Sequence, residues 1–182
     1  MRNCLILALV ILAAAGCSQR VVSPSLGKER MPDNRYDYLL TEALRQKYVG
    51  DINEAATLFE KCIELDKTGA VPYFELAQMY SAAGISGKSL KYASTAARLD
   101  PDNYWYQLAC GSLFTQYEIK DSALVYFTRA LKADRRAVEV NGILAGLYSE
   151  KGETEKADSL FRVMESEGIM TPEMSLMMIS GL

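Results

Sequence analysis

The sequence contains no histidine among its 182 residues. This absence excludes Ser-His-Asp and Cys-His catalysis and every histidine-liganded metal site. Its four cysteines are too few and too scattered for a disulfide framework. The formal charge of −3 means that basic residues are not in excess. The sequence therefore lacks the excess of positive charge that is typical of nucleic-acid-binding proteins. No glycine-rich phosphate loop or nucleophile elbow is present either. We therefore expect a protein that is not an enzyme and that needs no cofactor or metal.

Long hydrophobic runs are also scarce. The one prominent run covers residues 4–15, and its 12 residues are too few for a membrane-spanning helix, which needs about 20. A short positive start precedes it, and the run ends Ala14-Ala15-Gly16-Cys17. The length of this run and the residues that flank it are those of a secretory signal sequence. The remaining composition, 49% hydrophobic and 24% charged, is typical of one ordinary folded domain.

The small residues before Cys17 resemble the lipobox of bacterial lipoproteins. The resemblance implies a signal peptide over residues 1–16, lipidation of Cys17 and stable anchoring by its acyl chains. Ala14 departs from the family, where Leu is commoner, and an ordinary signal peptide cut after Ala15 is the alternative. Ser18 after the cysteine implies, by analogy, the outer membrane and its periplasmic face. Residues 17–35 then form the lipidated cysteine and a flexible tether, unless Val21, Val22 and Leu26 fold back onto the domain.

A period of 34 residues runs through the rest of the chain without insertion or deletion. Residues 50–66 recur in register at 84–100, 118–134 and 152–168. Small residues repeat at two positions of the period, and larger apolar residues repeat between them. A fixed period of this length with paired helical patterns indicates a helical solenoid.

This pattern resembles the tetratricopeptide repeat (TPR) family, with repeats at 36–69, 70–103, 104–137 and 138–171. Position 8 of each repeat holds Ala43, Ala77, Gly111 and Ala145, and position 20 holds Ala55, Ser89, Ala123 and Ala157. Position 24 is Phe59, Ala93, Phe127 and Phe161, and the turn at position 15 is Gly50, Gly84, Glu118 and Gly152. The family's proline at position 32 is present only as Pro101. The resemblance implies an all-α, right-handed superhelical solenoid whose concave face is lined by the first helix of each repeat.

Residues 172–182 predict one further helix, with Thr171 as its N-cap and Pro172 at its first position. It is either a capping helix, a surface that pairs with a second copy, or the start of a fifth repeat in a longer chain. Its apolar stripe would mediate a homodimer through Met174, Met177, Met178 and Leu182.

The TPR resemblance also implies a partner-binding groove on the concave face. Counting positions along the first helices of repeats one to three gives an apolar strip with a few polar residues: Leu40, Leu44, Val71, Phe74, Gln78, Trp105, Leu108 and Ser112. Such a strip suits a bound helix or an extended segment of a partner protein. Trp105, between Tyr104 and Tyr106, is the expected hot spot, with a packed core tryptophan as the alternative. The Lys and Asn clamp by which some family members bind a C-terminal carboxylate is absent.

These observations lead to one main hypothesis and two alternatives. The main hypothesis is a lipid-anchored, non-enzymatic TPR scaffold of the bacterial envelope that holds a partner segment, with secretion, pilus or outer-membrane assembly as candidate settings by analogy. The alternatives are a self-associating structural lipoprotein and the N-terminal TPR part of a longer protein.

Overall fold

The structure is a computed structural model that describes residues 34–180. The predicted signal peptide, Cys17 and Leu182 therefore lie outside the described residues. Within them every regular element is an α-helix. The helices are α1 (Arg35–Val49), α2 (Ile52–Leu65), α3 (Ala70–Ala82), α4 (Ser86–Leu99), α5 (Tyr104–Gln116), α6 (Lys120–Ala133), α7 (Val138–Glu150), α8 (Thr154–Ser166) and α9 (Pro172–Ser180). None of the helices described here has the length and hydropathy that a membrane span requires.

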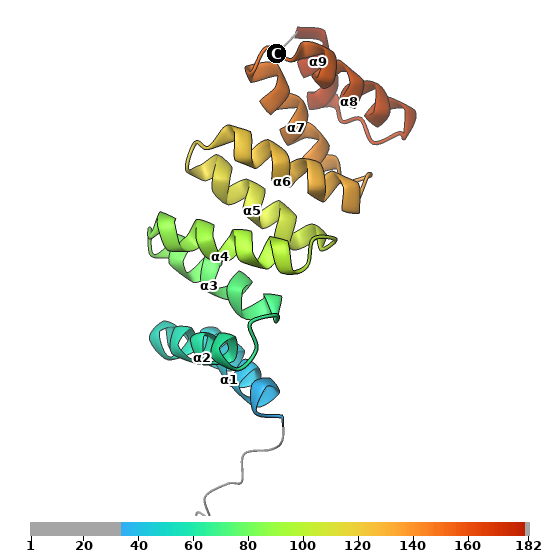
Figure 1. Ribbon diagram of the computed structural model, residues 1–182. Coiled ribbons are helices and arrows are strands. Elements are labelled where there is room, and N and C mark those ends of the chain that lie inside the picture. Colours follow the sequence, from blue (N-terminus) through green and yellow to red (C-terminus); the bar gives the residue numbers. More distant parts are fainter. Residues whose placement is uncertain (1–33, 181–182) are drawn as a thin grey trace, which may run out of the picture. The chain divides into compact units, whose positions relative to one another are not determined.

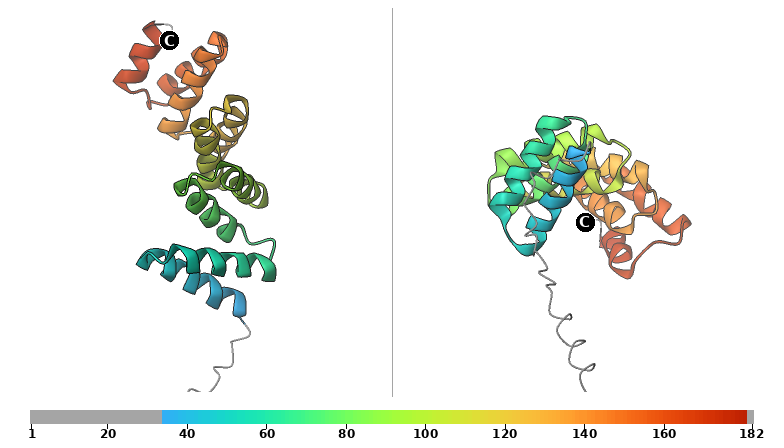
Figure 2. Two further views of the ribbon diagram at one scale, coloured as in Figure 1. Left: turned by 90° about the vertical axis from the view of Figure 1, so that its left-hand side faces the viewer. Right: turned by 90° about the horizontal axis from the view of Figure 1, so that it is seen from below.

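The helices are arranged as successive hairpins, which confirms the predicted helical solenoid. The two helices of each hairpin pack together, α1 on α2, α3 on α4, α5 on α6 and α7 on α8. Each second helix then packs on the first helix of the next hairpin. Figure 1 and the turned view in Figure 2 show the hairpins following one another in chain order from α1 to α8.

The core is built where small residues let the two helices of a hairpin approach closely, as predicted. All eight residues at positions 8 and 20 of the repeats are buried: Ala43, Ala77, Gly111, Ala145, Ala55, Ser89, Ala123 and Ala157. Beside them lie Phe59, Phe127 and Phe161, each at most 1% exposed. Because the helix axes lie close together and the phenyl rings fill the space beside them, water is excluded from the core. A single hairpin cannot bury its apolar face alone, so each hairpin depends on its neighbours for a closed core.

The turn inside each hairpin requires a left-handed backbone. Gly50, Gly84 and Gly152 adopt it with φ of 90°, 72° and 73°, and Glu118 adopts it with φ of 60° although it carries a side chain. In this conformation the β-carbon of an L-residue crowds the following carbonyl oxygen, which is why glycine is common there. Repeat three therefore makes the same turn as the others at a conformational cost.

Two buried amides hold the turns between hairpins, a feature that the sequence analysis did not predict. Gln107 Nε2 donates to the carbonyl oxygens of Ala97 (2.7 Å) and Pro101 (3.1 Å). Asn141 occupies the same position one repeat later and donates to the carbonyl oxygens of Arg135 (3.2 Å) and Ala137 (3.0 Å). Both side chains are fully buried. Gln107 provides a partner for the Ala97 carbonyl in the last turn of α4, where Pro101 has no N–H to donate, whereas the Ala137 carbonyl also accepts from the Asn141 amide (3.0 Å).

The last helix, α9, begins as predicted, because Thr171 Oγ1 accepts from the Met174 amide at 3.3 Å. Met174 is buried against α7 and α8 in the core of the last hairpin. The prediction that Met174 contributes to a homodimer is therefore wrong: its side chain is used inside the chain. The helix is not fully docked, however, since Leu176 and Ile179 are 67% and 77% exposed.

Candidate functional site

The eight residues of the predicted groove lie on α1, α3 and α5, the first helices of three consecutive hairpins. We call this set, Leu40, Leu44, Val71, Phe74, Gln78, Trp105, Leu108 and Ser112, the first-helix face. Leu44, Gln78, Trp105 and Ser112 are exposed, and Leu40, Val71, Phe74 and Leu108 are half-buried. None of the eight is fully buried, although Leu40 and Leu108 also pack against the core.

Trp105 is the most prominent side chain of the first-helix face, with 67% of its surface exposed. The alternative interpretation as a packed core tryptophan is therefore wrong. Asn103 caps α5 by accepting from the Trp105 and Tyr106 amides (3.1 and 3.3 Å), which sets the point where the helix begins. The Tyr104 ring meets the indole edge-on with centroids 5.1 Å apart. The indole is thus oriented by its neighbours while most of its surface faces solvent.

Phe74 connects the face to the next hairpin. Its ring lies 4.9 Å from the Tyr106 ring, a tilted aromatic contact between α3 and α5. Burial raises the pKa of the Tyr106 phenol, with smaller contributions from the nearby carboxylates of Asp100 and Glu75. The sequence analysis named Tyr106 as a neighbour of the expected hot spot Trp105. In the structure its half-buried ring packs against the ring of Phe74.

An ion pair between α1 and α3 lies at the edge of the face. Lys47 Nζ is 2.5 Å from Glu75 Oε2, and the Glu75 side chain is only 13% exposed. A cavity of about 430 Å³ opens beside it, lined by Lys47, Ile52, Gln78, Met79, Ala82 and Ala83. The sequence analysis predicted neither the ion pair nor the cavity. The cavity can accept an apolar side chain next to Gln78.

In the fourth hairpin, Met174 of α9 lies against Gly142 of α7. A β-carbon on Gly142 would come within 2.7 Å of the Met174 methyl carbon. The small residue therefore accommodates the last helix, while Glu139 near the start of α7 stays exposed.

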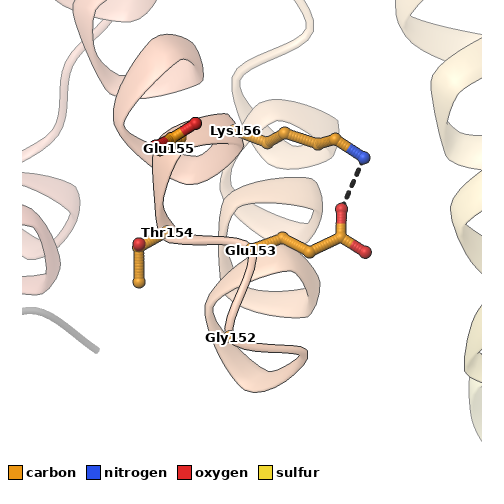
Figure 3. Close-up of a pocket in the computed structure, with 5 residues that line it drawn as sticks. All are labelled: Gly152, Glu153, Thr154, Glu155 and Lys156. Atoms are coloured by element: carbon orange, nitrogen blue, oxygen red, sulfur yellow. Dashed lines mark ion pairs between the residues drawn. The ribbon is translucent and has the colours of Figure 1, made fainter.

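A second cavity, about 280 Å³, lies at the turn between α7 and α8 and is lined by residues 152–156. Figure 3 shows the Glu153 and Lys156 side chains pointing toward each other. Their charged groups are 2.5 Å apart, so each largely neutralises the other. A neighbouring pair of salt bridges, Lys120–Glu150 (2.5 Å) and Lys151–Asp121 (2.6 Å), joins the turns of hairpins three and four. These charged side chains pair with one another at the turns of the solenoid, and they provide no reactive group.

The cysteines are the remaining candidates for chemistry, and the two that the structure describes belong to the core. Cys62 and Cys110 are buried and free, in agreement with the expectation that the cysteines form no disulfide framework. Burial raises the pKa of the Cys110 thiol to about 11, which keeps it protonated and unreactive. In the part of the chain that the structure describes, no cluster of cysteine and carboxylate side chains could hold a metal ion.

Comparisons with known proteins support the TPR assignment. A family model described as tetratricopeptide repeat matches residues 46–68. A crystal structure of MamA superposes with a TM-score of 0.62 at 18% identity, covering 72% of each chain. YrrB, described as a TPR protein with an unusual peptide-binding site, superposes with a TM-score of 0.64 at 21% identity, covering 74% of this chain and 71% of its own.

MamA from Desulfovibrio magneticus is similar as well, with a TM-score of 0.58 at 16% identity and coverage of 72% of this chain and 75% of its own. No curated protein sequence matches. At these identities the solved structures establish the fold alone, and they agree with the helical solenoid described above.

Proposed function

We propose that this protein is a non-enzymatic scaffold that binds a segment of a partner protein on its first-helix face. The TPR fold suggests protein–protein interaction in general. The observation that supports this particular surface is the exposure of Trp105 on a helix whose other aromatic and leucine side chains are at least half-buried. An exposed tryptophan next to apolar neighbours is the kind of residue that dominates binding energy. The peptide-binding site named for YrrB gives the proposal a precedent on a similar fold.

Site-specific photo-crosslinking in the native host tests the proposal. A crosslinking amino acid placed at Trp105 or Phe74 should give the same discrete adduct. The same amino acid at Lys132, an exposed residue of the second helix α6, serves as the control and should not. Trp105→Ala and Phe74→Ala should weaken the capture with little loss of helicity. Adducts that are equally abundant at all three positions would contradict the proposal.

We also propose that lipid on Cys17 anchors the scaffold to a bacterial envelope membrane. The support is the lipobox-like sequence Ala14-Ala15-Gly16-Cys17. By analogy, the expected location is the outer membrane facing the periplasm, in a secretion, pilus or outer-membrane assembly. Cys17→Ser should abolish incorporation of a labelled fatty acid and move the protein to the soluble fraction. A variant that stays lipidated would overturn the proposal.

A second candidate function, self-association, is favoured by the exposed apolar side chains of α9. Leu176, Met178 and Ile179 remain exposed after Met174 has docked. Light scattering on the chain from Ser18 onward distinguishes a dimer from a monomer. If the dimer exists, Met178→Glu and Ile179→Glu should halve the mass. A monomer whose mass neither variant changes would reject it.

A further inference from the structure

We propose that the cavity between the first and second hairpins receives an aromatic side chain, Phe or Tyr, of the bound partner segment. This inference rests on the scaffold function proposed above and adds the residue that anchors the segment. It follows from comparing this cavity with the equivalent places between the later hairpins.

The cavity is formed by both hairpins. Hairpin one contributes Lys47 and Ile52, and hairpin two contributes Gln78, Met79, Ala82 and Ala83. Lys47 is the only charged residue among the six, and its ammonium group is paired with Glu75 at 2.5 Å. The volume of about 430 Å³ lies within the range of pockets that bind small ligands, so it has room for one aromatic side chain. Because Gln78 also belongs to the first-helix face, a segment bound on that face can reach the cavity.

The small residues of this cavity are particular to the junction of hairpins one and two. Ala82 and Ala83 occupy positions 13 and 14 of repeat two, where repeat three has Gln116 and Tyr117 and repeat four has Glu150 and Lys151. Ile52 occupies position 17 of repeat one, where the later repeats have Ser86, Lys120 and Thr154. The later junctions therefore carry larger or more polar side chains at the positions that line this cavity.

Tyr117 shows which side chain suits this place. It ends α5 with φ of −97° and ψ of 16°, and Ala83 ends α3 with the similar values of −82° and 0°. Two side chains that leave the same backbone conformation at equivalent positions start in the same direction. The Tyr117 ring packs against the core that joins hairpins two and three, and its hydroxyl oxygen is buried. The chain thus places an aromatic ring at one junction and leaves the equivalent place open beside Ala83.

The junction of hairpins three and four has a different character. Its cavity, about 520 Å³, is lined by Glu118, Ile119, Lys120, Asp121 and Lys151. Four of these five side chains are charged, and an apolar ring placed there would remove water from them. Of the two cavities, the one between hairpins one and two is therefore the one that suits an apolar ring.

The lining residues also favour an aromatic ring over other side chains. The thioether of Met79 makes favourable contacts with aromatic rings, and the exposed amide of Gln78 can exchange a hydrogen bond with a tyrosine hydroxyl. An aliphatic side chain would fill less of the volume and gain fewer dispersion contacts. A carboxylate would lose hydration and meet a lysine that already has Glu75 as its partner.

Photo-crosslinking in the native host identifies what enters the cavity. A diazirine amino acid placed at the exposed residue Gln78 should give an adduct whose attachment point lies beside a Phe or Tyr of the partner. A synthetic peptide of about 12 residues copied from the attached segment then binds the full chain in a fluorescence-anisotropy assay. Replacing its aromatic residue with Ala should weaken binding by about tenfold to a hundredfold, because a buried ring is lost. An attached segment without an aromatic residue, or unchanged binding of the Ala peptide, would overturn the inference.

Cavity-filling variants locate the effect. Ala83→Tyr provides the ring that Tyr117 provides one junction later, and it should weaken both the adduct and the binding of the peptide by about tenfold or more. The matched control is Ala133→Tyr, at an exposed residue that ends α6, and it should change neither.

Ile52→Lys is a second variant, because it introduces the charge that Lys120 brings to hairpin three. Its matched control is Ile85→Lys, since the two isoleucines are 48% and 45% exposed and only Ile52 lines the cavity. All four substitutions replace exposed side chains, so the helicity should be preserved. Undiminished binding in both Ala83→Tyr and Ile52→Lys would overturn the site.

The outcomes separate this inference from the proposed function. An adduct at Trp105 with none at Gln78 would overturn the cavity site and leave the scaffold function standing. Absence of an adduct at both positions would overturn both. An adduct at Gln78 with a second copy of this chain would replace the partner segment with self-association.

Discussion

The Phe127 ring lies directly against Gly111: a β-carbon built on Gly111 would be 2.8 Å from two carbons of the ring. The two residues occupy positions 8 and 24 of the same repeat, on α5 and α6. Phe127 is 1% exposed and belongs to the core of the third and fourth hairpins. The ring therefore occupies the space that a β-carbon on residue 111 would need.

Gly111→Ala should therefore destabilise the protein by about 1–3 kcal/mol, the usual cost of overpacking a filled core. The matched control is Gly87→Ala on α4, where a β-carbon would meet nothing within 4 Å. That change should stabilise the protein by about 0.5–1 kcal/mol, because alanine is the better helix former. Urea unfolding followed by circular dichroism measures both. A neutral Gly111→Ala would mean that the Phe127 ring moves aside freely.

Glu118→Gly should stabilise the protein by about 1 kcal/mol. Glu118 holds a left-handed conformation that glycine adopts without steric cost, as at Gly152 in the next hairpin. The reciprocal change, Gly152→Ala, should cost a similar amount, and thermal unfolding of the two variants provides the comparison. Loss of stability in Glu118→Gly would show that the glutamate side chain has a stabilising contact that outweighs the strain.

Gln107→Met should cost about 1–3 kcal/mol of unfolding free energy. The substitution keeps the length of the side chain but removes both hydrogen bonds, to the buried carbonyl group of Ala97 and to the part-buried carbonyl group of Pro101. Gln116→Met, at an exposed site on the same helix, should change stability by less than about 0.5 kcal/mol. Equal behaviour of the two variants would contradict the role assigned to Gln107.

The buried Cys110 thiol should make stability fall in alkaline solution. Its pKa is raised by burial from 9.0 to about 11, so the thiol ionises earlier in the unfolded chain than in the folded one. The stabilising contribution is complete below pH 9 and is lost as the pH rises through about 11, with an upper limit of about 2–3 kcal/mol. Comparing urea unfolding of the wild type with Cys110→Ser between pH 8 and pH 11 isolates this group, since serine does not titrate there. Parallel curves for the two proteins would refute the prediction.

Local sequence spacing was enough to predict the parts of the fold that repeat. The small residues at Ala43, Ala77 and Ala145 and the rings of Phe59 and Phe161 recur every 34 residues, because close helix axes allow little else at those positions. The turn was equally predictable at Gly50, and the register placed Glu118 at the same position of repeat three, but its left-handed conformation was not predicted. The N-cap of α9 at Thr171 required only local hydrogen-bonding rules.

The candidate site could be predicted only as a set of positions. Which of them stay exposed depends on neighbours that belong to other hairpins, as the contact of Met174 with Gly142 shows. The pairing of Lys47 with Glu75 and the support of Phe74 by Tyr106 likewise join helices that are distant in the chain. The side-chain direction of Trp105 could not be read from its position, since the same residue type serves cores and binding surfaces.

The sequence by itself determined the repeat, the helix pairs and the absence of catalytic histidine chemistry, because helix periodicity and close packing are properties of residues at fixed spacing. Only the tertiary structure decided that Trp105 faces solvent, that Gln107 and Asn141 hold the inter-hairpin turns, and that α9 closes the fourth hairpin with Met174. These outcomes depend on contacts between hairpins, where exposure and hydrogen bonding are set by whichever side chains the stacking brings together.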